Sequence, residues 1–337
     1  MTTLILTRSD LTALLEGDEG EGLREAVVAA VERAHVDLAE GRAVLPAPPA
    51  MRLPGTDGAY LAMAAASAPA GLAAVKLLSD LPGNRARGLP VQRSTILLTS
   101  ARTGACAALL DGAPVTRVRT AAATAVATRA LARADARVLG LIGTGPLAWE
   151  HARALLPHRP YERIVLWGRT REHADALAAR ITAQLHVKAE ALASPRAVTE
   201  SCDVLCTLTP SREPVVRGAW FAPGLHVNAV GAPPRPDHRE IDTAGVVRSR
   251  IVVDAYATAL EKSGDVLLPL AEGALTEGRF RTELGDVLTG RAPGRADASE
   301  ITLFDSVGVG LQDLAAGRLL VDAARERGLG RFVDLTS

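Results

Sequence analysis

The 337-residue sequence is poor in aromatic residues, cysteine and lysine. Aromatic side chains make up 3% of the chain, so aliphatic and alanine side chains must form most of its interior. The three cysteines form an odd, sparse set, which indicates reduced thiols rather than a disulfide framework. Lys76, Lys188 and Lys262 are the only lysines among 38 basic residues, so arginine supplies nearly all the positive charge.

Charge and hydropathy exclude several classes of partner. The chain carries 38 acidic and 38 basic residues without a block of like charge, so it lacks the basic patch of a nucleic-acid-binding or membrane-surface protein. A helix needs about 18–20 apolar residues to cross a bilayer, and no apolar run in this sequence is that long. The N-terminal apolar stretch is too short for a signal peptide. We expect a soluble cytoplasmic protein that binds small molecules or other protein chains, with no nucleic-acid or membrane partner.

Residue types that ligate metals are scattered along the chain. The seven histidines are dispersed without metal spacing, and Cys202 and Cys206 lie in a predicted strand without a second pair of ligands nearby. We therefore expect no metal site, and we expect both cysteines to be small buried side chains.

From about residue 137 onward, short strands alternate with helical segments. This alternation predicts an α/β fold in which a parallel sheet is covered by helices on both faces, as in a Rossmann dinucleotide-binding domain. The strands are expected at 137–143, 163–168, 186–192, 203–209, 225–231 and 250–255.

The part of the chain before this alternation has a different pattern. Loops rich in proline and glycine separate segments such as 94–112, which has the pattern of a strand pair, so an α+β unit is expected. The helical segment 311–328 is expected to pack back onto this unit. We predict one domain formed by residues 1–124 with 305–337 and a second formed by 125–304.

The segment 143–148 reads GTGPLA and lies between a predicted strand and a predicted helix. In this context the pattern G-x-G-x-x-A is typical of a dinucleotide site, because glycines let the backbone approach a pyrophosphate at the positive end of the helix. The alternative is a glycine-rich turn without a ligand. The residues expected to contact the cofactor are Gly143, Thr144, Gly145, Pro146 and Leu147.

The next strand ends in Trp167-Gly168-Arg169-Thr170, without an acidic residue. Turns that bind NAD carry an acidic residue here for the ribose 2′-hydroxyl, whereas a guanidinium and a hydroxyl suit a 2′-phosphate. We therefore expect Arg169 and Thr170 to bind the cofactor and NADP(H) to be favoured over NAD(H). The alternative is that Arg169 is one more solvated arginine.

The segment 111–133 predicts a helix capped by Thr116, with Arg119 and Thr120 in its first turn. An arginine near a helix N-terminus opposes the helix dipole unless an anion binds there. Arg119 is therefore a candidate for a substrate carboxylate and Thr120 for a cofactor phosphate. The alternative for Arg119 is an exposed arginine without a ligand.

Lys76 lies inside the apolar run GLAAVKLLSD. Arginine cannot give up its proton, whereas the pKa of a lysine in apolar surroundings can shift toward neutrality. Lys76 is therefore a candidate for a titratable nitrogen, and the alternative is a side chain that extends its ammonium group to solvent.

Several segments together resemble the ornithine cyclodeaminase/mu-crystallin family. They occur in order between about residues 70 and 320, and they include KLLSDLPGNRARGLP, ALLDGAPVTRVRTAAATAVAT, LGLIGTGPLA, HVNAVGAPPRPDHREID and LFDSVGVGLQDLAA. The resemblance implies a substrate-binding and dimerisation domain completed by the C-terminal segment, a Rossmann domain that binds NAD(P), and a homodimer. It also implies activity on imines derived from amino acids.

The resemblance assigns roles to individual residues. Lys76 matches the family's active-site lysine and Arg119 its carboxylate-binding arginine. Arg52 and Ser306 fall at further positions implied in substrate binding. The residues implied on the nicotinamide side are Thr207, Val230 and Gly231.

Departures from the family pattern favour one branch of it. Cyclodeaminases carry an aspartate shortly after NAVG, where this chain has Ala232-Pro233-Pro234. The LKESGD of ketimine reductases appears here as LEKSGD, so the acid and the lysine are exchanged. The sequence is closer to the ketimine reductases, but it leaves a catalytic carboxylate open among Asp80, Glu261, Asp265 and Asp305.

The resemblance, with the arginine-bearing turn at 169–170, implies an enzyme that uses NADPH to reduce a C=N bond. The expected substrate is a cyclic ketimine carboxylate such as pyrroline- or piperideine-2-carboxylate, or an imine of a 2-oxo acid and an amine. Two alternatives remain open at this point. One is an NAD-assisted ornithine or lysine cyclodeaminase, and the other is a protein that binds NADPH and a small carboxylate without turnover.

Overall fold

The computed structural model describes residues 2–335 and divides the chain into two compact units. One unit comprises residues 1–119 and 308–337, and the other comprises residues 120–307. The boundaries expected from the sequence, 124/125 and 304/305, lie within five residues of the divisions at 119/120 and 307/308. In the described part of the chain, no helix is both long and apolar enough to span a membrane.

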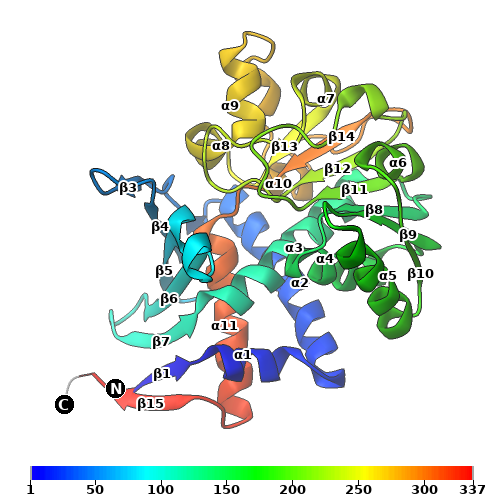
Figure 1. Cartoon of the computed structure of the whole chain (residues 1–337). Helices are drawn as coiled ribbons and strands as arrows, with labels where there is room; N and C mark the ends of the chain where they lie inside the picture. Colours follow the sequence, from blue (N-terminus) through cyan, green and yellow to red (C-terminus); the bar gives the residue numbers. More distant parts are fainter. Residues whose placement is uncertain (1, 336–337) are drawn as a thin grey trace. The chain divides into compact units, whose positions relative to one another are not determined.

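The first unit is an α+β unit built on an eight-stranded sheet (Figure 1). The strand order is β15-β1-β7-β6-β5-β4-β2, and β3 also pairs with β4. The strands are β1 (Thr2–Leu6), β2 (Ala43–Val44), β3 (Ala50–Arg52), β4 (Ala59–Ser67), β5 (Leu72–Asp80), β6 (Gln92–Ser100), β7 (Cys106–Asp111) and β15 (Arg331–Asp334). β6 and β7 are the predicted strand pair, and they are antiparallel.

Three helices complete this unit: α1 (Arg8–Leu15), α2 (Asp18–Ala39) and α11 (Gly310–Glu326). Buried and half-buried residues alternate strictly along β4, which shows that one face of the sheet is covered. The covering helix is α11, which packs on β4, β5, β6 and α2 (Figure 1). The prediction that the closing helix packs back on the first unit is therefore confirmed.

The second unit contains a seven-stranded sheet in which every pairing is parallel. The order is β10-β9-β8-β11-β12-β14-β13, so it reverses between β8 and β11 as in a doubly wound nucleotide-binding fold. The strands are β8 (Val138–Ile142), β9 (Arg163–Trp167), β10 (Lys188–Ala191), β11 (Val204–Thr207), β12 (His226–Ala229), β13 (Arg250–Val253) and β14 (Thr302–Asp305).

The helices of this unit follow its strands in the chain. They are α4 (Pro146–Leu155), α5 (Arg171–Leu185), α6 (Pro195–Ser201), α7 (Thr243–Arg248), α8 (Tyr256–Lys262), α9 (Gly264–Ala271) and α10 (Leu284–Leu288). The remaining helix, α3 (Gly112–Leu131), runs from the first unit into the second. Cys202 and Cys206 are free and buried, as predicted.

All six predicted strands of the second unit are present, but the sequence did not reveal β14. This strand has four residues, and all of them are buried. It pairs with β12 on one side and β13 on the other, so it lies between strands that precede it in the chain. Burial on both faces removes the alternation of polar and apolar residues that identifies an exposed strand.

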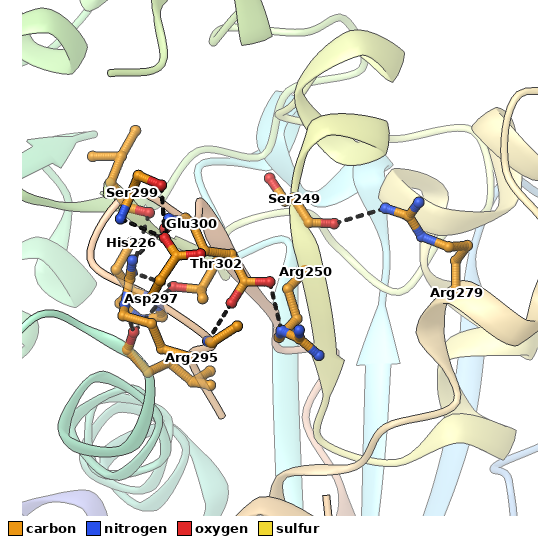
Figure 2. A network of polar contacts seen from close by, with 12 residues as sticks. His226, Ser249, Arg250, Arg279, Arg295, Asp297, Ser299, Glu300 and Thr302 are labelled. Atoms are coloured by element: carbon orange, nitrogen blue, oxygen red, sulfur yellow. Dashed lines mark hydrogen bonds and ion pairs between the residues drawn. The ribbon is translucent and has the colours of Figure 1, made fainter. Parts of the chain in front are cut away.

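A polar network fixes the amino ends of these central strands (Figure 2). Arg295 donates from Nη2 to Thr302 Oγ1 over 2.9 Å and from Nε to the Leu131 carbonyl over 2.8 Å. His226 Nδ1 lies 2.9 Å from the same Thr302 oxygen, and burial lowers the pKa of His226 to about 3. His226 is therefore a neutral hydrogen-bonding residue at the amino ends of the strands, opposite to the end that carries the glycine-rich turn.

Candidate functional site

Lys76 is buried at the centre of the first unit. It lies on β5 with 1% of its surface exposed, and its Nζ is 2.7 Å from Asp313 Oδ2 in the first turn of α11. It also donates to Thr116 Oγ1 over 3.4 Å. The ammonium group does not extend to solvent, so the alternative interpretation of Lys76 is wrong.

The surroundings of Lys76 lower its proton affinity. The pKa of Lys76 is lowered to about 8, chiefly by burial; the positive charge of Arg119 also lowers it, whereas Asp313 acts in the opposite direction. Asp313 is itself buried, and its two cationic partners hold its pKa below the usual value despite that burial. Lys76 is thus a base that exchanges a proton near neutral pH, which is what acid–base catalysis requires.

Arg119 shares the same carboxylate. Its Nε donates to Asp313 Oδ1 over 3.2 Å, and its Nη1 donates to Gln312 Oε1 over 2.8 Å. The Gln312 amide nitrogen lies 3.1 Å from Nε2 of the buried His35. Gly308 has φ +76°, and a Cβ there would lie 2.7 Å from Arg119 Nη1, so only glycine leaves room for the guanidinium.

The structure corrects the reasoning that led to Arg119. The helix α3 begins at Gly112, not after Thr116, because Asp111 Oδ1 accepts from the Ala113 N–H and caps it. Arg119 and Thr120 therefore lie in the body of the helix, where the N-terminal dipole argument does not apply. Arg119 is held by side chains of α11, and Thr120 is buried at the start of the second unit.

Arg52 lies apart from this group. It is exposed on β3 and is paired in register with Ala59. Asp80 ends β5 and is buried, with 1% of its surface exposed. The described structure therefore brings Lys76 and Arg119 together around Asp313 and leaves Arg52 outside that cluster.

In the second unit, the glycine-rich turn has the form that a pyrophosphate requires. Gly143 follows β8 with φ +120°, and Gly145 is the residue that precedes α4, with Pro146 in the first turn. No side chain of the described residues caps α4, and a Cβ at Gly145 would meet no atom within 4 Å. A helix start without a side-chain cap and open space beside Gly145 fit the phosphates of a dinucleotide. Thr144 and Leu147 lie at the same turn and are half-buried.

The turn after β9 is open to solvent. Arg169 and Thr170 are both exposed, and Thr170 precedes α5 without a side-chain hydrogen bond to the helix. Gly168 packs on the glycine-rich turn, since a Cβ there would lie 2.5 Å from Thr144 Cγ2. The two turns therefore lie side by side, and the described residues leave the Arg169 guanidinium at the surface.

Thr207 and Gly231 both donate hydrogen bonds to Glu240, a residue that the sequence analysis did not single out. Thr207 ends β11, and Val230 and Gly231 follow β12. The Thr207 hydroxyl and the Gly231 N–H both donate to Glu240 Oε2, over 2.8 Å and 2.7 Å. Glu240 lies in the segment PRPDHREID, which was quoted for the family resemblance but without a role for this residue.

The candidate carboxylates of the second unit have different environments. Glu261 is exposed, whereas Asp265 and Asp305 are buried. Burial raises the pKa of Asp265 to about 6, and burial together with neighbouring acids raises that of Asp305 well above its usual value. Asp305 and Ser306 line a small recess with Val230, Pro233 and Lys262.

Two functional candidates were missed by sequence reasoning, Asp313 and Glu240. The signal for Asp313 was the QD pair at the start of the closing helix, but its partners Lys76 and Arg119 are about two hundred residues away in the chain. Charge pairing over such separations cannot be read from a single sequence.

Comparison with known proteins places this geometry in a family. The family model for ornithine cyclodeaminase/mu-crystallin matches residues 13–328. The chain is 33% identical over 261 residues to the Delta(1)-pyrroline-2-carboxylate reductase of Bacillus cereus, which covers 77% of this chain and 80% of the relative. It is 34% identical over 248 residues to the ketimine reductase mu-crystallin of Mus musculus, covering 74% of this chain and 75% of that protein.

Solved structures agree over nearly the whole chain. The Thermococcus litoralis Delta(1)-pyrroline-2-carboxylate reductase, in complex with NADH and L-proline, is 35% identical with a TM-score of 0.90 and covers 98% of this chain and 100% of its own. An archaeal alanine dehydrogenase dimer with bound NAD is 29% identical with a TM-score of 0.91, covering 99% and 100%.

Proposed function

This chain belongs to the ornithine cyclodeaminase/mu-crystallin family, and from that premise we propose that it is an oxidoreductase that reduces the C=N bond of an amino-acid-derived imine with a nicotinamide cofactor. The observation that carries the proposal is the buried group of Lys76, Asp313 and Arg119. It combines a lysine that exchanges a proton near neutral pH with a guanidinium that suits a carboxylate.

In this mechanism the residues of the chain bind the substrate and supply its proton. Arg119 binds the substrate carboxylate, and Lys76 donates a proton to the imine nitrogen. The cofactor, when bound, supplies a hydride to the imine carbon, so that one hydride and one proton convert C=N to CH–NH. Asp313 stabilises the protonated form of Lys76 and holds the Arg119 guanidinium.

The substrate class that we propose is a cyclic ketimine carboxylate, such as pyrroline- or piperideine-2-carboxylate, or a linear imine of a 2-oxo acid and an amine. The activities named for the Bacillus cereus and Mus musculus relatives support this class. The absence of an acid at 232–234, where cyclodeaminases carry one, favours reduction over cyclodeamination.

The cofactor that we propose is NADP(H). Arg169 and Thr170 lie exposed beside the glycine-rich turn, in the place where a 2′-phosphate is recognised, and the strand before them does not end in an acid. Solved relatives with the same fold hold NADH or NAD. The preference for NADP(H) that we propose therefore depends on the residues of this turn and not on the fold.

The test is to incubate the protein with NADPH and piperideine- or pyrroline-2-carboxylate and to follow the absorbance of the reduced cofactor. We expect consumption of NADPH that requires the imine. No consumption with any cyclic or linear imine overturns the proposal. Release of ammonia from ornithine or lysine without net change in the cofactor identifies a cyclodeaminase instead, and saturable NADPH binding without turnover identifies a binding protein.

A further inference from the structure

Three strand ends meet in the second unit where the order of its sheet reverses. β8, β11 and β12 are neighbours, and their carboxyl ends lead into Gly143, the segment 207–209 and Gly231. A Cβ on Gly143 would lie 2.7 Å from the Leu208 carbonyl oxygen, and one on Gly231 would lie 2.1 Å from the Thr209 nitrogen. The three segments therefore pack backbone against backbone, without room for side chains between them.

The fully buried carboxylate of Glu240 joins two of these segments. Its Oε2 accepts from the Thr207 hydroxyl over 2.8 Å and from the Gly231 N–H over 2.7 Å. Its Oε1 accepts from the N–H and the hydroxyl of Thr209, over 2.6 Å and 2.7 Å. Four donors converge on one side chain, and a carboxylate is the group that accepts all four.

Asp265 holds the backbone from which Glu240 projects. Its Oδ1 accepts from the N–H groups of Glu240 and Ile241, over 3.0 Å and 2.8 Å. Asp265 lies in the first turn of α9, which is capped by the Ser263 side chain. Glu240 is thus fixed at both its backbone and its carboxylate.

We propose that Glu240 is a positioning residue for the nicotinamide half of the cofactor, an inference that rests on the proposed nicotinamide dependence. A dinucleotide lies across the crevice at the point where the strand order reverses, with its two halves on opposite sides of that point. The glycine-rich turn after β8 serves the pyrophosphate and the adenosine half. Glu240 fixes the ends of β11 and β12, which face the other half, and it contacts neither the cofactor nor the reacting atoms.

The experiment compares two ligands that differ in the nicotinamide portion. Binding of NADPH and of 2′-phospho-ADP-ribose is measured by calorimetry on the wild-type chain and on Glu240→Gln, and the pair NADH and ADP-ribose is run in parallel. In the variant, the amide nitrogen faces N–H and O–H donors, so the strand ends shift. We expect affinity for NADPH to fall at least about tenfold, because the displaced strand ends face its nicotinamide half. Affinity for 2′-phospho-ADP-ribose stays within about twofold.

Asp242→Asn is the matched control, because Asp242 also accepts from two backbone N–H groups, those of Gly218 and Gly245, but away from the strand ends. We expect it to lower the melting temperature without changing the ratio of the two affinities. Thr209→Val removes a single donor to Glu240 and serves if Glu240→Gln does not fold. We expect it to produce a smaller loss that is again confined to the nicotinamide-bearing ligand.

Equal losses for both ligands in Glu240→Gln or Thr209→Val, or no loss for either ligand, overturn the inference. The same selective loss in Asp242→Asn also overturns it, as does a wild-type chain that binds neither NADPH nor NADH. Failure of the proposed reaction has a different signature. A chain that binds NADPH but reduces no imine overturns that reaction and leaves this binding comparison valid.

Discussion

At the scale of single residues, Lys76 is a buried lysine in a chain that otherwise uses arginine for nearly all its positive charge. Burial disfavours the ammonium form, and the buried Asp313 offsets part of that effect, so the pKa of Lys76 lies at about 8. A guanidinium in the same place would remain charged and could not deliver a proton. The pairing with Asp313 therefore raises the proton affinity of Lys76 and fixes its position.

Lys76→Arg preserves the charge and removes the exchangeable proton. We expect imine reduction to fall by about a hundredfold to ten-thousandfold, the usual contribution of proton transfer, while NADPH binds as in the wild type. Steady-state kinetics and calorimetric binding measure the two effects. Lys188→Arg, at an exposed position on β10, is the control and should retain full activity. Full activity of Lys76→Arg would contradict the role of Lys76 as proton donor.

Asp313→Asn tests the coupling between the carboxylate and the lysine. Reduction requires protonated Lys76, so the wild-type rate should fall as pH rises through about 8. Asp313 raises the pKa of Lys76, so its removal lowers that pKa and should move the decline in rate to lower pH. A pH–rate profile with an unshifted alkaline limb would contradict this assignment. KM should also rise, because Arg119 loses a partner that holds its guanidinium.

At the scale of structural elements, the turns after β8 and β9 have different proposed roles in cofactor binding. The turn between β8 and α4 offers a helix start without a side-chain cap and an open approach at Gly145. The turn between β9 and α5 offers an exposed arginine and no acid. The first suits any dinucleotide, whereas the second carries the NADP preference that we propose, through a contact with the 2′-phosphate.

Arg169→Ala should reduce that distinction. We expect affinity for NADPH to fall about tenfold to a hundredfold, because a charge-assisted contact with the phosphate is lost, while affinity for NADH is nearly unchanged. The ratio of the two dissociation constants is the measurement. Arg171→Ala is the control, since Arg171 is already paired with Asp175 at 2.9 Å. An unchanged ratio in Arg169→Ala, or a wild type that prefers NADH, would contradict the proposed specificity.

At the scale of the whole molecule, one face of the first unit's sheet is only partly covered by the residues that the structure describes. Along β5, Ala74 and Lys76 are buried, whereas Ala73, Val75 and Leu77 are exposed or half-buried. Val75 is paired in register with Ala64 on β4 and Leu97 on β6, so this apolar face extends over three strands. An uncovered apolar face of this kind indicates a protein interface, and we propose that it joins two copies of the chain.

Sedimentation should therefore give a particle of twice the 35.1 kDa mass of one chain. Leu77, with 45% of its surface exposed, lies on this face, and Leu77→Glu should produce a folded monomer. Phe332→Glu is the control, because Phe332 is exposed on β15 at the far edge of the same sheet. A monomeric wild type, or a dimer that survives Leu77→Glu, would contradict the interface.

Much of the fold followed from local pattern. Strands such as β8 and β9 were predictable because each is a short apolar run bounded by turn residues and followed by a helix. The strand β14 was not, because it lies between β12 and β13 without the chain order that would place it there. The start of α3 was also misplaced, because a cap by Asp111 at the end of β7 competes with Thr116, and the sequence does not show which cap forms.

The sequence by itself determined the kind of chemistry: a glycine-rich turn for a dinucleotide, an arginine where NAD-binding turns carry an acid, and a rare lysine in an apolar strand. These signals are local, because each depends on neighbours within a few residues. The tertiary structure alone decided which charges act together. Asp313 joins Lys76 to Arg119, and Glu240 joins Thr207 to Gly231, across separations in the chain that only folding closes. A buried charge needs a partner, and the partner is often distant in the chain. Such pairs follow no periodic sequence pattern, so a single sequence does not reveal them.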